Sequence, residues 1–203
     1  MRIRRLEEAD AVAAGSLLAR AFAGSPVFIA AVPDRARRSL LSLPLFVVNV
    51  RHACRYGEAW ALQDPDGILL AVGYTVDRPE PHLDAAAAAD LGFTALGRDW
   101  APELQVLAAY EAAAARELGG IAEPWRYLGA IAVEPRLQGR GHGRALLAHI
   151  RAAAGGMAVG LVTDHATNVP FYERAGFSVT WTGTPVPGGP TFWAMEAAGQ
   201  PPR

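Results

Sequence analysis

The chain has 203 residues, 51% of them hydrophobic, which suits one substantial core and is short for two ordinary domains. Its 19 basic residues, all arginines, oppose 20 acidic residues, and the formal net charge of −1 provides no global basic field for nucleic acid or an anionic membrane. We therefore expect a single domain over residues 1–203, with neither nucleic acid nor a membrane as partner.

Cysteine content and hydropathy indicate the compartment. Cys54 is the only cysteine, so it has no partner for an internal disulfide, and a reducing cytoplasm fits it best. The N-terminal segment lacks an apolar leader region, and no stretch approaches the ~20 apolar residues that span a bilayer. We expect a soluble cytoplasmic protein in which Cys54 is a buried structural thiol within a helix.

The first quarter of the chain predicts a strand followed by two helices. Residues 3–6 read as a short strand, and residues 8–22 carry apolar side chains at helical spacing. Pro26 then breaks the chain. Asp34 can cap a second helix, which Pro44 can split or kink.

The rest of the chain alternates strands with helices. Residues 64–67, Asp-Pro-Asp-Gly, form the turn of a hairpin, because proline fixes φ and glycine accepts a positive φ. This order predicts an α/β fold, a mixed sheet with helices on its faces. The expected strands are 58–63, 68–76, 127–133, 157–163, 177–184 and 191–196, and the expected helices are 84–96, 102–118, 144–154 and a short one near 171–175.

A glycine-dense turn, Gln-Gly-Arg-Gly-His-Gly at residues 138–143, lies between an apolar strand and a helix. Such a turn can place several backbone N–H groups around one anion, with the helix dipole in the same direction, and the natural ligand is a pyrophosphate. The order Gln-x-x-Gly-x-Gly fits neither a Walker loop nor a Rossmann fingerprint. Taken alone, the turn is equally compatible with a solvent-facing loop.

Two segments together carry a family resemblance. Residues 127–143 and the later Asn-Val-Pro-Phe-Tyr-Glu-Arg-Ala-Gly-Phe at 168–177 resemble the two signatures of the GCN5-related N-acetyltransferases (GNAT), in the family's order. The short first strand, the helix ending in Ala21-Phe22 and the tail 187–190 resemble puromycin N-acetyltransferase and its relatives. The resemblance covers nearly the whole chain and is loose between residues 79 and 122. It implies the GNAT variant of the α/β (α+β) class, a central, mostly antiparallel, splayed sheet flanked by helices.

The resemblance also implies acetyl-CoA as the acyl-donor co-substrate. The strand exit would bind the pantetheine arm through main-chain atoms, and the glycines would let the backbone approach the pyrophosphate. Arginines can add charge-assisted contacts, and His142 has a backbone role only. Asn168 would lie beside the pantetheine arm, with helix capping as its ordinary alternative. The expected cofactor-binding residues are Ile131, Ala132, Val133, Gln138, Gly139, Arg140, Gly141, His142, Gly143, Arg144 and Asn168.

Tyr172 is the candidate catalytic residue. Pro170 suits the first turn of a short helix and Gly176 suits its end, so Tyr172 is held on a fixed element. A tyrosine with a pKa of ~10 is protonated at pH 7 and can donate a proton to a departing thiolate. The matching tyrosine of the family is commonly the general acid. The alternative is an aromatic that packs its ring and exposes its hydroxyl to water.

The general base stays unassigned. An ammonium substrate must lose a proton before it attacks. Relatives of puromycin N-acetyltransferase often carry a glutamate two residues before the position matched by Asp164, and this chain has Val162 there. Asp164, His165, Glu123 and Glu103 are candidates, although such residues are more often caps or solvated charges, and solvent is a further possibility.

We expect an acetyltransferase that transfers the acetyl group to a primary amine of a small molecule by direct attack on the thioester. No metal site and no covalent enzyme intermediate are expected, and the protein would be a monomer or a homodimer. One alternative is an enzyme that acetylates protein N-termini or lysines. The other is a non-catalytic acyl-CoA-binding regulatory domain.

Overall fold

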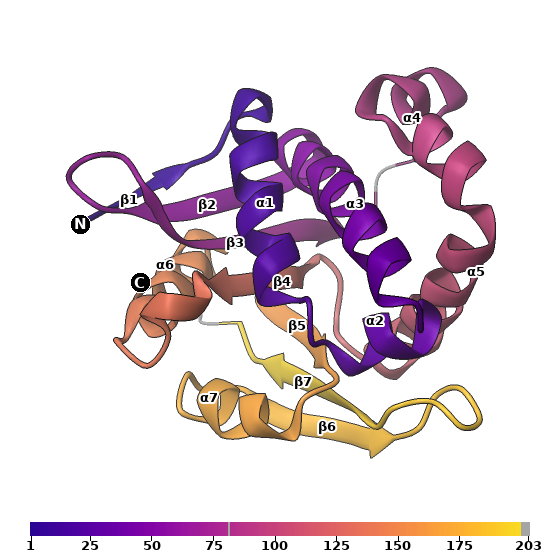
Figure 1. Cartoon of the computed structure of the whole chain (residues 1–203). Helices are drawn as coiled ribbons and strands as arrows, with labels where there is room; N and C mark the ends of the chain where they lie inside the picture. The colour runs from indigo at the N-terminus through magenta and orange to yellow at the C-terminus, as the bar shows by residue number, and fades with distance from the viewer. Residues whose placement is uncertain (81, 200–203) are drawn as a thin grey trace.

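In a computed structural model, which describes residues 1–80 and 82–199, the strands form one seven-stranded sheet with the order β1-β2-β3-β4-β5-β7-β6 (Figure 1). Neighbouring strands are antiparallel except for β4 and β5. The α/β fold with a mixed, mostly antiparallel sheet is therefore confirmed. The strands are β1 (Arg2–Arg5), β2 (Gly57–Gln63), β3 (Leu69–Arg78), β4 (Trp125–Val133), β5 (Ala158–Thr163), β6 (Ser178–Gly183) and β7 (Phe192–Ala197).

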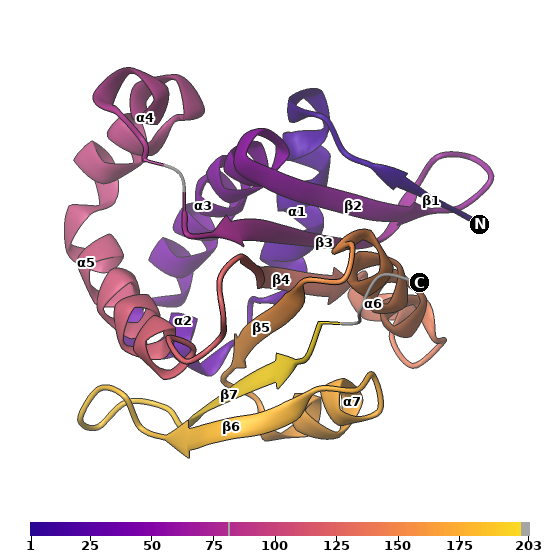
Figure 2. The same cartoon turned by 180° about the vertical axis from the view of Figure 1, so that it is seen from behind.

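Helices cover both faces of this sheet. The helices α1 and α3 pack on one face, and α6 lies on the opposite face, as the two opposed views show (Figures 1 and 2). The pair α4–α5 is inserted between β3 and β4. The helices are α1 (Ala11–Ala21), α2 (Pro26–Ala31), α3 (Arg35–Tyr56), α4 (Ala85–Leu91), α5 (Phe93–Glu117), α6 (His142–Ala153) and α7 (Val169–Glu173), with 3₁₀ turns η1 (Glu8–Asp10), η2 (Pro135–Leu137) and η3 (Ala166–Asn168).

The sheet splays between β4 and β5. The parallel ladder joins only three residue pairs, residues 125–127 with 158–160. Beyond Tyr127, β4 continues to Val133 paired with β3 alone, and a register shift next to Tyr74 leaves Gly129 out of the β3 ladder. One edge of β4 from Leu128 onward is therefore not paired with β5, and this splay positions the site described below.

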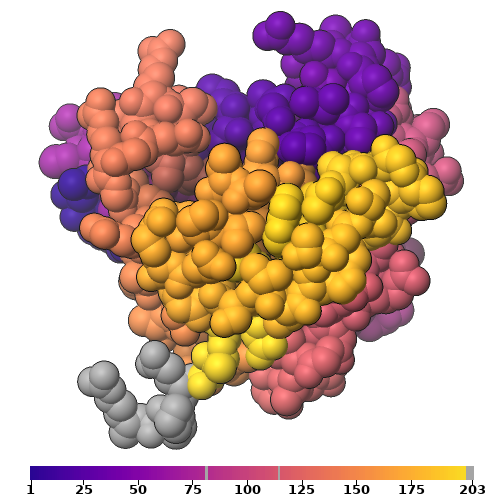
Figure 3. Space-filling model, turned by 90° about the horizontal axis from the view of Figure 1, so that it is seen from below, coloured from indigo at the N-terminus to yellow at the C-terminus, as the bar shows by residue number. Residues whose placement is uncertain are grey.

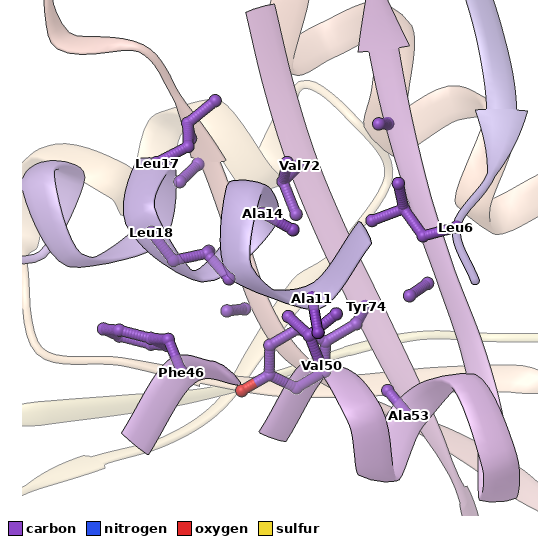
Figure 4. Close-up of a cluster of buried hydrophobic side chains, with 14 of the residues drawn as sticks. Leu6, Ala11, Ala14, Leu17, Leu18, Phe46, Val50, Ala53, Val72 and Tyr74 are labelled. Carbon is purple, nitrogen blue, oxygen red and sulfur yellow. The ribbon is translucent and has the colours of Figure 1, made fainter. Parts of the chain in front are cut away.

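The core on the α1 and α3 face is made of small and branched side chains from both helices and the sheet. Ala11, Ala14, Leu18 and Val50 are fully buried there, and Val72 of β3 meets them from the sheet (Figure 4). Burying such side chains contributes roughly 25 cal/mol per Å² of apolar surface. The tight fit of α1 on the sheet depends on its alanines, because larger side chains at these positions would push the helix away.

Most boundaries lie within one or two residues of the expectation, and the exceptions involve proline and glycine. Pro26 does not break the chain but begins α2, where it suits the first turn, and the Ser25 hydroxyl accepts a hydrogen bond from the Phe28 N–H. Asp34 caps α3 as expected, accepting from the Arg37 N–H at 2.7 Å. Pro44 does not split α3, which continues to Tyr56.

The helical insertion α4–α5 differs from the expected helices 84–96 and 102–118. The first helix ends earlier, at Leu91, because Gly92 adopts a positive φ of 102°. The second begins at Phe93 and is kinked at Trp100, two residues before Pro102. Helix periodicity alone does not locate such a kink.

Cys54 lies in α3 as expected, and it is half-buried. Its thiol contacts the Leu6 carbonyl oxygen at 3.5 Å, and burial raises the pKa of the thiol to about 11. Within residues 1–80 and 82–199, no helix combines the length and the apolarity that a membrane crossing requires.

Candidate active site

A groove of about 940 Å³ opens where β4 and β5 diverge. Its walls are residues 128–133 of β4, residues 137–144 leading into α6, and residues 162–165 at the end of β5. The short helix α7 contributes Tyr172, and the end of α1 contributes Phe22. Volumes of this order are typical of ligand pockets, which lie where secondary-structure elements separate.

All of the residues expected from the sequence to bind the co-substrate, together with Tyr172, line this one groove. Residues about 40 positions apart in the chain are thus brought together by the fold, as the sequence predicts. The groove also contains residues that sequence reasoning missed, and the clearest are Phe22, Ser25, Thr163 and Arg174. The Ser-Pro pair at 25–26 is a helix-start signal that could have been recognised, whereas the other three have no local signal.

The glycine turn is held open by backbone conformation. Gly139 and Gly141 have φ of 77° and 86°, which residues with a Cβ rarely adopt, and Gly141 is the N-cap of α6. At Gly143 a Cβ would lie 3.3 Å from Cγ2 of Val133, so the helix approaches β4 closely here. The first backbone N–H groups of a helix have no partner within it, so the start of α6 presents donors to the groove.

Side chains fix the two ends of the groove. The amide of Gln138 donates to the Val133 carbonyl oxygen at 3.4 Å, which holds the turn against the end of β4. Asn168 precedes α7 but makes no capping bond to it, and its amide donates to Oγ1 of Thr163 at 3.1 Å. Helix capping, the alternative role of Asn168, is therefore not found, and its amide contacts β5 instead.

Tyr172 is rigidly packed within the groove wall. Its side chain is 8% exposed, and its ring lies 5.0 Å from the ring of Phe171 and 5.7 Å from that of Phe177, both edge to face. Burial, and to a lesser extent the charge of Asp164, raises the pKa of the Tyr172 hydroxyl. The hydroxyl is therefore protonated at neutral pH and acts as a hydrogen-bond donor.

The acidic residues considered from the sequence are placed unequally. Asp164 lines the groove, but its Oδ2 accepts from the Ser25 hydroxyl at 2.6 Å and from the Val27 N–H at 2.9 Å. Glu103 is ion-paired with Arg37 on α3. Asp164 thus anchors the start of α2, and Glu103 ties α5 to α3. Both carboxylates therefore already have structural partners.

Comparison with known proteins finds a family model that matches part of the chain. Residues 102–179 match the family model described as an acetyltransferase (GNAT) domain. This stretch, which is less than half of the chain, is similar to GNAT acetyltransferase domains. The matched GNAT region begins within α5, contains the glycine turn and Tyr172, and ends in β6.

Solved structures support the GNAT fold over nearly the whole chain. A protein described as histone acetyltransferase HPA2 and related acetyltransferase, from Corynebacterium glutamicum, is 21% identical with a TM-score of 0.67, over 98% of this chain and 97% of that one. A mosquito arylalkylamine N-acetyltransferase like 5b is 16% identical with a TM-score of 0.60, over 96% and 98%. A paia N-acetyltransferase from Thermoplasma acidophilum, solved with coenzyme A, is 10% identical with a TM-score of 0.58, over 97% and 98%. At these identities the likeness establishes the GNAT fold.

No cluster of three or more His, Cys, Asp or Glu side chains suited to a metal ion occurs within residues 1–80 and 82–199. The groove itself offers backbone donors, arginine side chains and the hydroxyl of Tyr172.

Proposed function

We propose that the protein transfers an acetyl group from acetyl-CoA to the primary amine of a small molecule. The observation that carries this proposal is the convergence, in one groove, of the unpaired edge of β4, the glycine turn before α6 and the buried hydroxyl of Tyr172. These three elements suit, in turn, the pantetheine arm, the pyrophosphate and the thioester of an acyl-CoA.

The groove fits the co-substrate along its length. The edge of β4 that faces away from β3 can pair with the amide groups of a pantetheine arm, as an added strand would. The N–H groups at the start of α6 suit a pyrophosphate, and the positive φ of Gly139 and Gly141 turns the backbone toward it. Arg140, Arg144 and Arg174 line the same end and supply positive charge.

Acetyl-CoA supplies an acetyl group activated as a thioester. The free amine adds to the thioester carbonyl and its nitrogen then loses a proton to water, while main-chain N–H groups of the β4 edge are available to stabilise the oxygen on which negative charge develops. The Tyr172 hydroxyl donates to the sulfur as the bond between carbon and sulfur breaks. Its raised pKa keeps this proton in place until the leaving group gains charge.

A small acceptor is favoured by the packing of the β6–β7 turn against α5 and α2, in an apolar cluster that includes the groove residue Val162. The turn between β6 and β7 reaches α5, since a Cβ at Gly189 would lie 2.5 Å from the Tyr110 hydroxyl. Val186 of this turn shares an apolar cluster with Val27 of α2. Figure 3 shows the yellow C-terminal strands between the purple N-terminal helices and the pink α5. This turn belongs to the tail on which the resemblance to puromycin N-acetyltransferase and its relatives rests, and we propose that subtype.

The proposal is tested by thiol release from acetyl-CoA against a panel of 2-phenylethylamine, histamine, putrescine and an aminoglycoside, with a lysine-rich peptide as the protein-type acceptor. Coenzyme A alone should raise the melting temperature of the protein, because a ligand that binds only the folded state stabilises it. Absence of this shift would contradict the assignment of the groove. Activity on the peptide alone would contradict the proposed small acceptor and indicate a protein acceptor.

Tyr172→Phe tests the catalytic role, and Tyr56→Phe, at the end of α3 and outside the groove, is its control. Loss of a general acid should lower kcat by ~10²–10⁴-fold. The shift in melting temperature with coenzyme A should be retained, since Tyr172 is assigned to the leaving group and not to the pyrophosphate. Unchanged turnover of Tyr172→Phe would exclude the general-acid role.

A further inference from the structure

Asp164 brings a carboxylate to the groove, away from its arginines. It directly follows the last residue of β5, and it is the only Asp or Glu among the described residues that line the groove. The two strands that form the groove diverge, so that β4 ends beside α6 and β5 ends beside α2 (Figures 1 and 2). Arg140 and Arg144 lie at the start of α6. The groove therefore has a basic end, suited to phosphates, and an acidic end.

The two oxygens of this carboxylate have different surroundings. Oδ2 accepts hydrogen bonds from the Ser25 hydroxyl at 2.6 Å and from the Val27 N–H at 2.9 Å. Oδ1 accepts no hydrogen bond within residues 1–80 and 82–199, and the protein does not enclose it. The bonds to Oδ2 hold the side chain of Asp164 in place, and Oδ1 is the oxygen that a ligand in the groove can reach.

The turn after β5 holds Asp164 in a fixed position relative to Tyr172. The amide of Asn168 donates to Oγ1 of Thr163 at 3.1 Å, and the N–H of His165 donates to the same oxygen at 3.4 Å. The N–H of Asn168 also donates to the His165 carbonyl oxygen at 3.0 Å, directly before α7 begins. The charge of Asp164 contributes to the raised pKa of Tyr172, as expected for two groups that lie near each other. A carboxylate and a phenol are thus held on one rigid segment of the groove wall.

Acetyl transfer needs a proton acceptor near the proton donor. In the tetrahedral intermediate the attacking nitrogen and the departing sulfur are bonded to the same carbon, and the nitrogen carries a proton that it must lose. A carboxylate can accept this proton while the hydroxyl of Tyr172 serves the sulfur. Neither Glu103 nor Glu123 lines the groove. His165 does line it, but no hydrogen bond fixes its imidazole within the described residues, whereas two fix the carboxylate of Asp164.

We propose that Oδ1 of Asp164 is the general base, and that it takes the proton of the attacking nitrogen before water receives it. This inference rests on the proposed acetyl transfer. The nitrogen lone pair forms the bond to the acetyl carbon, and the proton leaves the nitrogen for Oδ1. The bond between carbon and sulfur breaks, and the thiolate takes the proton of the Tyr172 hydroxyl. Asp164 then gives its proton to water and Tyr172 regains one from water, so the protein is unchanged after each turnover.

Asp164→Asn tests this role without removing the anchor of α2. Its amide oxygen can still accept from Ser25 and Val27, whereas its NH₂ group, in the place of Oδ1, cannot accept a proton. With whichever panel amine the wild type acetylates fastest, kcat should fall by ~10²–10⁴-fold. The shift in melting temperature with coenzyme A should be retained. Asp66→Asn, the same change in the exposed β2–β3 turn, should keep the kcat of the wild type.

Ser25→Ala separates the base from the anchor. It removes the 2.6 Å hydrogen bond to Oδ2 but leaves the carboxylate of Asp164 in the groove. Its melting temperature should fall further than that of Asp164→Asn, whereas its kcat should exceed that of Asp164→Asn by ~10-fold or more. A purely structural Asp164 would give the same order of the two variants in both measurements.

A kcat of Asp164→Asn equal to or above that of Ser25→Ala overturns the role of Asp164. A larger loss of kcat in His165→Gln than in Asp164→Asn also overturns it, because the imidazole would then be the proton acceptor. A wild type that acetylates none of the amines overturns the proposed acetyl transfer instead. The two failures are thereby distinguished.

Discussion

The ring of Tyr74 occupies the space that a side chain at position 129 would need. A Cβ on Gly129 would overlap Cε2 of that ring and lie 3.1 Å from Cδ2. Tyr74 is 6% exposed and packed in the core below α1 and α3, so it cannot move aside (Figure 4). The bulge at which β4 leaves β5 therefore depends on glycine.

Gly129→Ala should lower the free energy of unfolding by ~1–3 kcal/mol, the usual cost of overpacking a core. It should also weaken coenzyme A binding, because Gly129 lines the groove. Urea denaturation and a thermal-shift titration measure the two effects. Gly97→Ala is the control, since a Cβ there meets nothing within 4 Å and alanine favours helix. Equal stability of both variants would contradict the overlap.

The glycine turn offers a second pair of substitutions. Gly141→Ala forces a Cβ onto a φ of 86°, and Gly67→Ala does the same at 84° in the β2–β3 turn; neither Cβ would meet an atom closer than 3.9 Å. Both should cost ~1–2 kcal/mol in stability. Only Gly141→Ala should reduce the affinity for coenzyme A. A similar loss of affinity in Gly67→Ala would mean that strain alone, and not the anion site, is responsible.

Asp164 and Ser25 should act as one unit in stability measurements. Asp164→Ala leaves the buried Ser25 hydroxyl without its 2.6 Å acceptor and should cost ~1–3 kcal/mol. In a double-mutant cycle with Ser25→Ala, the combined loss should be smaller than the sum of the single losses. If the two losses of stability simply add, the contact between Asp164 and Ser25 does not hold α2 in solution.

Acid should weaken the link between β1 and η1. Arg4 binds both carboxylate oxygens of Asp10 at 2.7 Å, and this hydrogen bonding lowers the pKa of Asp10. Because the pKa of Asp10 is lower in the folded state, the ion pair stabilises the fold at pH values above the unfolded-state pKa of ~3.9. This stability is lost as the pH falls through the folded-state pKa. Asp10→Asn should therefore be less stable than the wild type near pH 7, by up to ~1 kcal/mol for a partly exposed pair, and this difference should disappear as the pH falls through the lowered folded pKa of Asp10.

A pH series of urea denaturation curves measures this effect, with Asp66→Asn in the β2–β3 turn as the control. A difference between Asp10→Asn and the wild type that persists at the acid end would contradict the ion-pair explanation.

The sequence predicted the groove better than the elements around it. Residues 138–143 and 168–177 carry local signals, because glycine with a positive φ and proline in a first helical turn are required by backbone geometry. Pro26, next to Ser25, carries the same helix-start signal, but a proline between two helices is equally typical of a chain break. Only the hydrogen bond from the Phe28 N–H to Ser25 shows that a helix begins here.

The acceptor side could not be predicted in the same way. The helix α5 is alanine-rich, and its apolar positions do not say which face meets the sheet. Its rotation is set by the stack of Tyr110 on the distant Phe192, a tertiary contact that leaves no pattern in the local sequence. The kink at Trp100 lies two residues before Pro102, and a proline there suits either a bend within one helix or the first turn of a second helix, so the sequence does not distinguish the two.

The three residue pairs between β4 and β5 make that seam the weakest join in the sheet. Few hydrogen bonds join the two strands there, so the backbone amides should exchange with solvent through local opening. The free energy of this opening should be lower than that of complete unfolding. On the proposed function, coenzyme A enters as an eighth, non-peptide strand that spans the gap. Substrate loading and mechanical closure of the sheet would then be the same event.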